Sequence, residues 1–181
     1  RDRFVTNGGA DQIFGADKGD TIHAGTGTDW ARLDLTFDPA TETDPAEDVH
    51  FNLLTQQSAT QTYFAGTSDE TQVSGLKLAW LYTGDGNDTY DARGVASSSN
   101  THSKSHYFSS NAGDDHFAID YTSVHAYAQF DAGDGFDKLT IDWGAATSIV
   151  NYDYPTDGRR SEINVFNGSF GWQRVQFSDV E

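Results

Sequence analysis

A nine-residue periodicity near the start of the chain constrains its fold more than any other feature. Written in nines, residues 6–32 read TNGGADQIF, GADKGDTIH and AGTGTDWAR, so Asp11, Asp20 and Asp29 recur at one spacing. A glycine-rich turn precedes each aspartate, and Ile13 and Ile22 follow the first two by two positions. The pattern matches the nonapeptide G-G-x-G-x-D-x-U-x, whose turn offers carbonyl oxygens and one carboxylate to calcium and whose apolar residue points into a parallel β-helix. We therefore predict short parallel strands joined by calcium-binding turns.

The same turn composition returns later in the chain. TGDGND, SSNAGDD and DAGDGFD place Asp88, Asp115 and Asp137 at the position of the repeated aspartate, and the first two lie three nine-residue steps apart. Glycine and aspartate are also favoured in ordinary hairpin turns for steric reasons. The periodic matches favour calcium over that simpler interpretation. The predicted metal ligands are Gly9, Asp11, Asp17, Asp20, Gly27, Asp29, Asp85, Gly86, Asn87, Asp88, Gly113, Asp114, Asp115, Asp131, Asp134, Gly135 and Asp137.

Alternate turns of such a repeat stack, because successive turns fall on opposite sides. We expect the turn of Asp11 to face that of Asp29, with one ion between them. The turn at Asp20 falls on the opposite side from the turns of Asp11 and Asp29, and no nearby turn shares its side. It therefore needs a partner from later in the chain, and Asp88 is the first candidate. Lys18 stands where this turn should have its fourth-position glycine, which predicts a less complete site.

These turns resemble the haemolysin-type calcium-binding (RTX) modules of secreted bacterial proteins. The resemblance implies an all-β fold, a calcium-bound parallel β-roll or β-helix with several Ca²⁺ ions in its turns. It also implies type I secretion and a place outside the cell or on the bacterial cell surface. We expect β-hairpin excursions to leave this roll and to thicken it towards a sandwich.

Two long excursions interrupt the repeat. In residues 38–75, the β-like runs at 49–54 and 60–65 predict a hairpin. Residues 144–171 correspond to this segment in the second half of the chain. The return strand GLKLAWLY at 75–82 has no polar face and predicts burial on both sides. We expect one domain over residues 1–181, made of two degenerate long units at about 6–93 and 111–181, and cut from a longer protein.

The charge of the chain narrows its partners. Lys and Arg number 11 against 28 Asp and Glu, a net charge of −17. Nucleic acid is thereby excluded as an expected partner, because phosphate binding needs clustered basic residues. Bound calcium would relieve the self-repulsion, and without cysteine it would replace disulfides as the staple of an extracellular domain. No apolar run approaches a bilayer span, so we expect a soluble domain without direct membrane insertion.

The aromatic residues suggest where function lies. Trp80, Phe130, Trp143 and Phe177 fall on predicted strands and should be core. The excursions carry aromatic residues that we expect to be exposed and to bind ligand, namely Tyr63, Phe64, Tyr152 and Tyr154.

The motifs favour a binding protein over an enzyme. No G-x-S-x-G or H-E-x-x-H motif is present, and calcium accounts for the carboxylates, so we do not expect catalysis. The resemblance favours a monomeric, calcium-dependent ligand-binding module of an RTX adhesin, with an extracellular peptide or glycan on a host or neighbouring cell as partner. The alternative is a calcium-triggered folding and secretion module of an exported enzyme. A module of that kind should carry longer uninterrupted nonapeptide arrays.

Overall fold

The computed structural model describes residues 1–36, 48–67, 69–95, 106–120, 127–144, 148–152, 161–167 and 171–180. The chain is all-β, as expected, and within these ranges its one helix is α1 (Leu53–Gln56). No helix of the described part is long and apolar enough to span a membrane. The strands are β1 (Arg3–Val5), β2 (Gly8–Gly9), β3 (Gln12–Asp17), β4 (Thr21–His23), β5 (Thr26–Gly27), β6 (Trp30–Asp34), β7 (His50–Asn52), β8 (Gln61–Tyr63), β9 (Thr71–Ser74), β10 (Leu78–Tyr82), β11 (Thr89–Asp91), β12 (His106–Ser109), β13 (His116–Asp120), β14 (Tyr127–Asp131), β15 (Lys138–Asp142), β16 (Ser148–Tyr152), β17 (Ser161–Asn167) and β18 (Gly171–Ser178).

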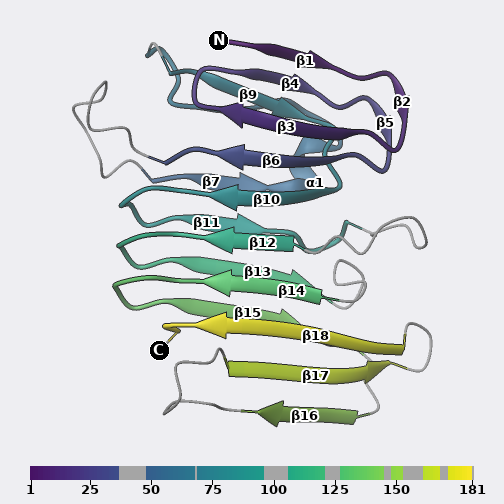
Figure 1. Cartoon of the computed structure of the whole chain (residues 1–181), viewed down its shortest axis with the longest axis vertical. Helices are drawn as coiled ribbons and strands as arrows, with labels where there is room; N and C mark the ends of the chain where they lie inside the picture. Colours follow the sequence, from purple (N-terminus) through teal and green to yellow (C-terminus); the bar gives the residue numbers. More distant parts are fainter. Residues whose placement is uncertain are drawn as a thin grey trace.

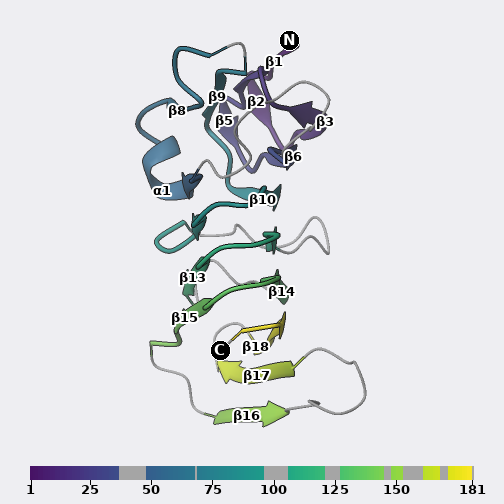
Figure 2. The ribbon, with the colours of Figure 1, turned by 90° about the vertical axis from the view of Figure 1, so that its left-hand side faces the viewer.

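The strands form two layers. The front layer is an eight-stranded sheet in the order β16-β17-β18-β14-β12-β10-β6-β3, which faces the viewer in Figure 1. Behind it lie two four-stranded sheets, β1-β4-β9-β8 and β15-β13-β11-β7, and Figure 2 shows the two layers from the side. From β10 to β15 the chain alternates between the layers, and each strand pairs in parallel with the next strand of its own layer. Consequently each turn lies beside the turn two strands away.

The core fills the space between the layers. Alternate residues of each strand point inward, and parallel pairing places equivalent positions side by side, as with Leu81 between Leu33 and Phe108. Phe108 stacks on Phe130 with 5.2 Å between ring centroids, and both rings are fully buried. Burying a side chain of this size stabilises the fold by about 1.5–3 kcal/mol. Trp143 and Phe177 are partly buried against the same core.

The return strand β10 corrects one expectation. Ala79 and Leu81 are fully buried, but Trp80 and Tyr82, which alternate with them, are only partly buried. The strand is therefore not buried on both sides. Its outer face is apolar because it carries aromatic residues, although the front sheet is covered on its inner face alone.

The two excursions take different courses. In the first, β7 joins the rear layer beside β11, and β8 pairs antiparallel with β9 rather than with β7, so the predicted hairpin is wrong. The reason lies in Asn52, whose Oδ1 accepts the Thr55 N–H at 2.8 Å and caps α1, turning the chain out of the layer (Figure 2). The second excursion does form an antiparallel hairpin, β16–β17, and β18 then returns parallel to β14.

Candidate metal centre in the stacked turns

Three glycine- and aspartate-rich turns stack along one edge of the layers, at the left of Figure 1. Turn I covers residues 83–88, turn II residues 110–115 and turn III residues 132–137. Parallel bridges join Asp85 of turn I to Ala112 of turn II, and Ala112 to Asp134 of turn III. The aspartates Asp88 and Asp115 are thus in register, as the sequence spacing predicts.

The last aspartate of each turn forms a ladder through the stack. Asp88 Oδ1 accepts the Val49 N–H at 2.7 Å, and Asp115 Oδ1 accepts the Asp88 N–H at 2.7 Å. Asp137 Oδ1 in turn accepts the Asp115 N–H at 2.9 Å. Each carboxylate belongs to a residue at most 2% exposed. One oxygen of every aspartate in the ladder is therefore satisfied by the backbone of the turn before it.

The second oxygen of these carboxylates is the distinctive feature of the site. Oδ2 of Asp88, of Asp115 and of Asp29 is buried and accepts no hydrogen bond of normal geometry from a described residue. The hydroxyls of Thr83 and Ser110 lie near the Asp88 and Asp115 carboxylates and lower their pKa, but burial outweighs them. A buried carboxylate oxygen without a donor is strongly unfavourable. These oxygens therefore call for a cation or a proton.

The raised pKa values of the aspartates in these turns also indicate a need for positive charge beside them. Burial above all, together with the neighbouring carboxylates of Asp88 and Asp137, raises the pKa of Asp115 to about 6. Burial also raises the pKa of Asp88 and of Asp29 from its ordinary value. Negative charge is thus poorly accommodated in these turns without a compensating positive charge.

A second ladder runs through the preceding position of each turn, in the opposite direction. Asp48 Oδ1 accepts the Asn87 N–H at 2.7 Å, Asn87 Oδ1 accepts the Asp114 N–H at 2.8 Å, and Asp114 Oδ1 accepts the Phe136 N–H at 3.1 Å. Asp48 and Val49 therefore occupy positions equivalent to the last two of turns I to III, with Val49 in place of the buried aspartate. Asp48 is not among the predicted ligands, and its one signal in the sequence is its place two residues before the strand that begins at His50.

The turns near the N-terminus stack on the other side of the layers, as expected. β2 pairs in parallel with β5, and Asp29 Oδ1 accepts the Asp11 N–H at 3.0 Å. A Cβ added to Gly27 would overlap the carbonyl oxygen of Gly9, and the same relation links Gly113 to Gly86. Glycine at this position lets one carbonyl approach the next turn closely.

The turn of Asp20 differs from the others, and Asp88 is not its partner. Asp20 Oδ1 accepts the Asp2 N–H at 2.5 Å and Oδ2 accepts the Asp17 N–H at 3.1 Å, so both oxygens have donors. On the other side, the Gly19 N–H bonds to the Asp69 carbonyl, and β9 follows beside β4. The insertion of β9 separates this turn from turn I, which explains the wrong prediction. In this turn, backbone N–H groups already bond to both carboxylate oxygens, in the place that an ion would take.

The remaining predicted ligands fall into two groups. Asp85, Asp134 and the carbonyl-bearing glycines lie in the stacked turns, whereas Asp131 ends strand β14 on the outer face of the front sheet, where it accepts the Tyr107 hydroxyl at 2.6 Å. The described residues contain no converging group of three or more His, Cys, Asp or Glu side chains. An ion in these turns would therefore need backbone carbonyl oxygens in addition to carboxylates.

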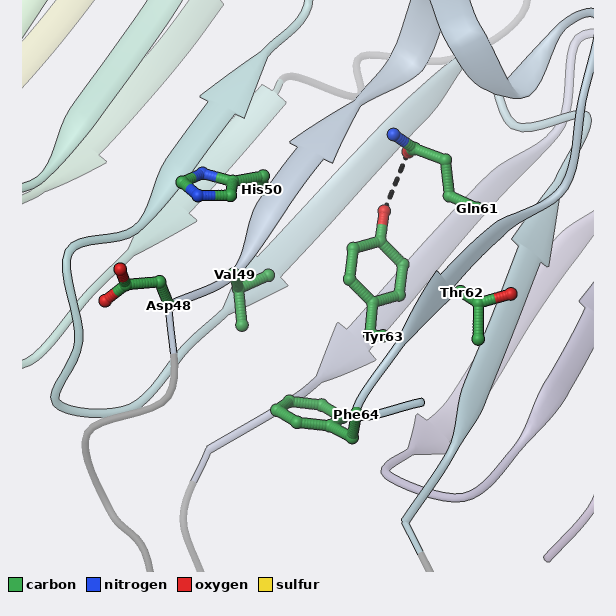
Figure 3. Close-up of a pocket in the computed structure, with 7 residues that line it drawn as sticks. All are labelled: Asp48, Val49, His50, Gln61, Thr62, Tyr63 and Phe64. Carbon is green, nitrogen blue, oxygen red and sulfur yellow. Dashed lines mark hydrogen bonds between the residues drawn. The ribbon is translucent and has the colours of Figure 1, made fainter. Parts of the chain in front are cut away.

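A pocket of about 240 Å³ adjoins turn I. Tyr63 and Phe64 line it and are each only 7% exposed, so the expectation that they are exposed is wrong. Tyr63 stacks on Phe51 at 5.7 Å between centroids, and its hydroxyl donates to Gln61 Oε1 at 2.7 Å (Figure 3). The other lining residues are Asp48, Val49, His50, Gln61 and Thr62.

The two aromatic residues predicted on the second excursion remain untested as ligand contacts. Tyr152 ends strand β16 with its side chain undescribed, and Tyr154 lies outside the described residues.

Comparison of the chain with family models, with curated proteins and with solved structures finds no match. Its function must therefore be inferred from the turns and the pocket themselves.

Proposed function

We propose that this chain is a calcium-bound β-roll of the haemolysin (RTX) type, with ions between its stacked turns. The supporting observation is the buried Oδ2 of Asp29, Asp88 and Asp115, which accepts no hydrogen bond of normal geometry from a described residue. Oxygen-only sites built from carboxylates and carbonyls suit calcium, which accepts six to eight such ligands in irregular geometry. Zinc and copper prefer the thiolate and imidazole ligands that these turns lack.

Carboxylates and turn carbonyls would share the coordination. The proposed carboxylate ligands are those of Asp29, Asp88, Asp115 and Asp137. Stacked glycines at the fourth turn position bring carbonyl oxygens of adjacent turns close together. The proposed carbonyl ligands of the ion come from Gly9, Gly27, Gly86, Gly113 and Gly135. Because the aspartates of different turns meet only in the folded chain, binding free energy becomes folding free energy.

The proposed biological role is calcium-dependent ligand binding by an extracellular adhesin, with a peptide or glycan on another cell as partner. Support comes from the position of the pocket: Asp48 lines it and also accepts the Asn87 N–H of turn I. An ion that orders turn I would thereby fix one wall of the pocket. The pocket volume suits one side chain or one sugar ring.

Calcium titration of two variants tests the metal site. Asp115→Asn should weaken calcium binding about tenfold or more, because it removes a charged ligand from the middle of the ladder. Asp20→Asn is the matched control, since both oxygens of Asp20 already have backbone donors. Isothermal titration calorimetry measures both. Unchanged calcium affinity in the Asp115 variant would refute the proposed site.

Glycan and peptide arrays, probed with calcium and with chelator, test the ligand-binding role. Calcium-dependent retention of a defined ligand, weakened by His50→Ala at the pocket rim, is the expected result. Folding that depends on calcium together with silence on both arrays would instead favour a secretion module attached to an exported enzyme.

A further inference from the structure

The outer face of the front sheet carries a continuous row of aromatic rings. Phe14 on β3 contacts Trp30 on β6 at 4.8 Å between centroids, and Trp30 contacts Trp80 on β10 at 5.3 Å. Trp80 then contacts Tyr107 on β12 at 6.1 Å, and Tyr107 contacts Tyr82 at 5.2 Å. The row crosses four neighbouring strands. We call it the aromatic row.

Hydrogen-bonding side chains continue the row onto β14 and β18. The Asp131 carboxylate accepts the Tyr107 hydroxyl at 2.6 Å, Gln129 Nε2 at 3.1 Å and the Ser178 hydroxyl at 3.1 Å. The Tyr127 hydroxyl lies 2.6 Å from Oε1 of Gln129 and 2.6 Å from Oε1 of Gln176. These bonds hold an acceptor and two amides in fixed positions on a partly exposed surface. We call this group the polar network.

The composition of this face is unusual for its position. No described helix or strand covers it in either view (Figures 1 and 2). The chain is rich in charged residues, which could occupy a surface that faces solvent. Nevertheless, Phe14 is 60% exposed, and Trp80, Tyr82 and Tyr107 remain partly exposed, whereas Trp30, which packs between Phe14 and Trp80, is only 5% exposed. Partly exposed aromatic residues beside ordered polar groups are characteristic of binding surfaces.

We propose that the aromatic row and the polar network together bind a neutral linear glycan lying across the strands. A sugar ring offers apolar C–H faces, which pack on aromatic rings, and hydroxyl edges, which bond to the carboxylate and amides. Each successive strand presents the next side chain about 4.8 Å further along. A chain of sugar rings can thus meet a ring or a polar group at successive strands.

Charge and backbone chemistry decide against other polymers. Asp34 and Asp131 on this face are matched by Arg32, which lies 4.9 Å over the Tyr82 ring, and by Arg174, which is in register with Tyr127. The face therefore offers no excess of positive charge to an anionic polysaccharide or nucleic acid, and the net charge of −17 repels both. Strands β6, β10, β12 and β14 are each paired on both sides, and only β3 lies at the edge of the sheet, so a ligand lying across the strands meets side chains alone over most of this face. An extended peptide gains much of its affinity from backbone pairing at a sheet edge. A glycan needs none.

This surface lies on the front sheet, whereas the pocket at Tyr63 adjoins the rear layer, so the proposal is independent of the proposed pocket ligand. Affinity electrophoresis of the full chain in calcium tests it, with hydroxyethyl cellulose, xyloglucan, galactomannan and laminarin as neutral probes and alginate and polygalacturonate as anionic ones. We expect retardation by at least one neutral probe and by neither anionic probe. No retardation by any neutral probe, or stronger retardation by an anionic probe, would overturn the proposal.

Variants locate the binding on this face. Trp80→Ala should weaken binding about tenfold or more, and Asp131→Asn, which keeps the size of the side chain, should weaken it several-fold. Phe136→Ala removes an aromatic residue that is 74% exposed in turn III, away from the front sheet, and should leave binding unchanged. Near-UV circular dichroism verifies folding, and Asp131→Asn remains decisive if Trp80→Ala does not fold. Equal binding by the wild type and by folded Trp80→Ala and Asp131→Asn would refute the site.

A separate measurement keeps the two proposals apart. Thermal unfolding of the wild type with and without calcium reports on the metal sites alone. Calcium stabilisation without glycan retardation would overturn only the glycan surface. Glycan retardation without calcium stabilisation would overturn only the metal sites.

Discussion

Asp115 is the residue whose proton should couple folding to pH. Burial raises its pKa to about 6 from an ordinary 3.8. The folded state then holds the proton more tightly than the unfolded state, so the calcium-free fold should gain stability as pH falls from about 7 to about 4. With calcium present the sign reverses, because protons compete with the ion for the carboxylates. Urea unfolding of calcium-stripped and calcium-saturated protein across this range measures both slopes.

Asp115→Asn is the control for this pH dependence. The variant cannot titrate at this position, so its calcium-free stability should change less with pH than that of the wild type. A residual slope of the same sign is expected, because burial also raises the pKa of Asp88 and Asp29. A calcium-free wild type that loses stability as pH falls from about 7 to about 5 would contradict the assignment.

At the scale of the turn, glycine decides whether two coils can stack. Gly9 and Gly27 occupy the same turn position, and both have φ of +131°. A Cβ on Gly9 meets nothing within 4 Å, whereas a Cβ on Gly27 would overlap the carbonyl oxygen of Gly9. Both alanine variants should lose about 1–2 kcal/mol from backbone strain. Gly27→Ala should lose about 1–3 kcal/mol more from the forced separation of the turns.

Chemical denaturation of the two variants measures this difference. Gly9→Ala serves as the control, because it carries the strain without the overlap. Calcium affinity should also fall further in Gly27→Ala, because the carbonyl of Gly9 is a proposed ligand. Equal losses of stability in the two variants would show that close stacking of these turns contributes nothing beyond the local φ.

At the scale of the whole molecule, charge should make folding depend on cations. The net charge of −17 opposes compaction, and the buried aspartates concentrate part of it in the turns. Chelation of calcium should therefore unfold the domain or lower its midpoint of thermal unfolding markedly. Raising NaCl from about 0.05 to about 0.5 M should recover part of that loss by screening.

Circular dichroism with thermal unfolding measures both effects. Magnesium at the same concentration as calcium is the control, because it demands tighter octahedral geometry and should stabilise the domain less. A far-ultraviolet spectrum and a midpoint that chelation leaves unchanged would contradict a calcium-dependent fold. Recovery by NaCl as complete as by calcium would mean that screening alone suffices.

The sequence by itself determined the local features that depend on neighbouring residues. Periodic glycine and aspartate fixed the turns, and the spacing of Asp11 and Asp29 fixed their pairing. These follow from backbone freedom and alternation along one chain. The calcium itself remains a prediction of the same pattern.

Only the tertiary structure decided which distant segments meet. The insertion of β9 beside β4 placed the Asp69 carbonyl against the Gly19 N–H in the turn of Asp20. The pairing of β7 with β11 brought Asp48 to turn I. The burial of Tyr63 and the exposure of Trp80 were likewise set by which face of each strand another layer covers. Such pairing depends on the free energy of packing across the whole chain, which no local pattern encodes.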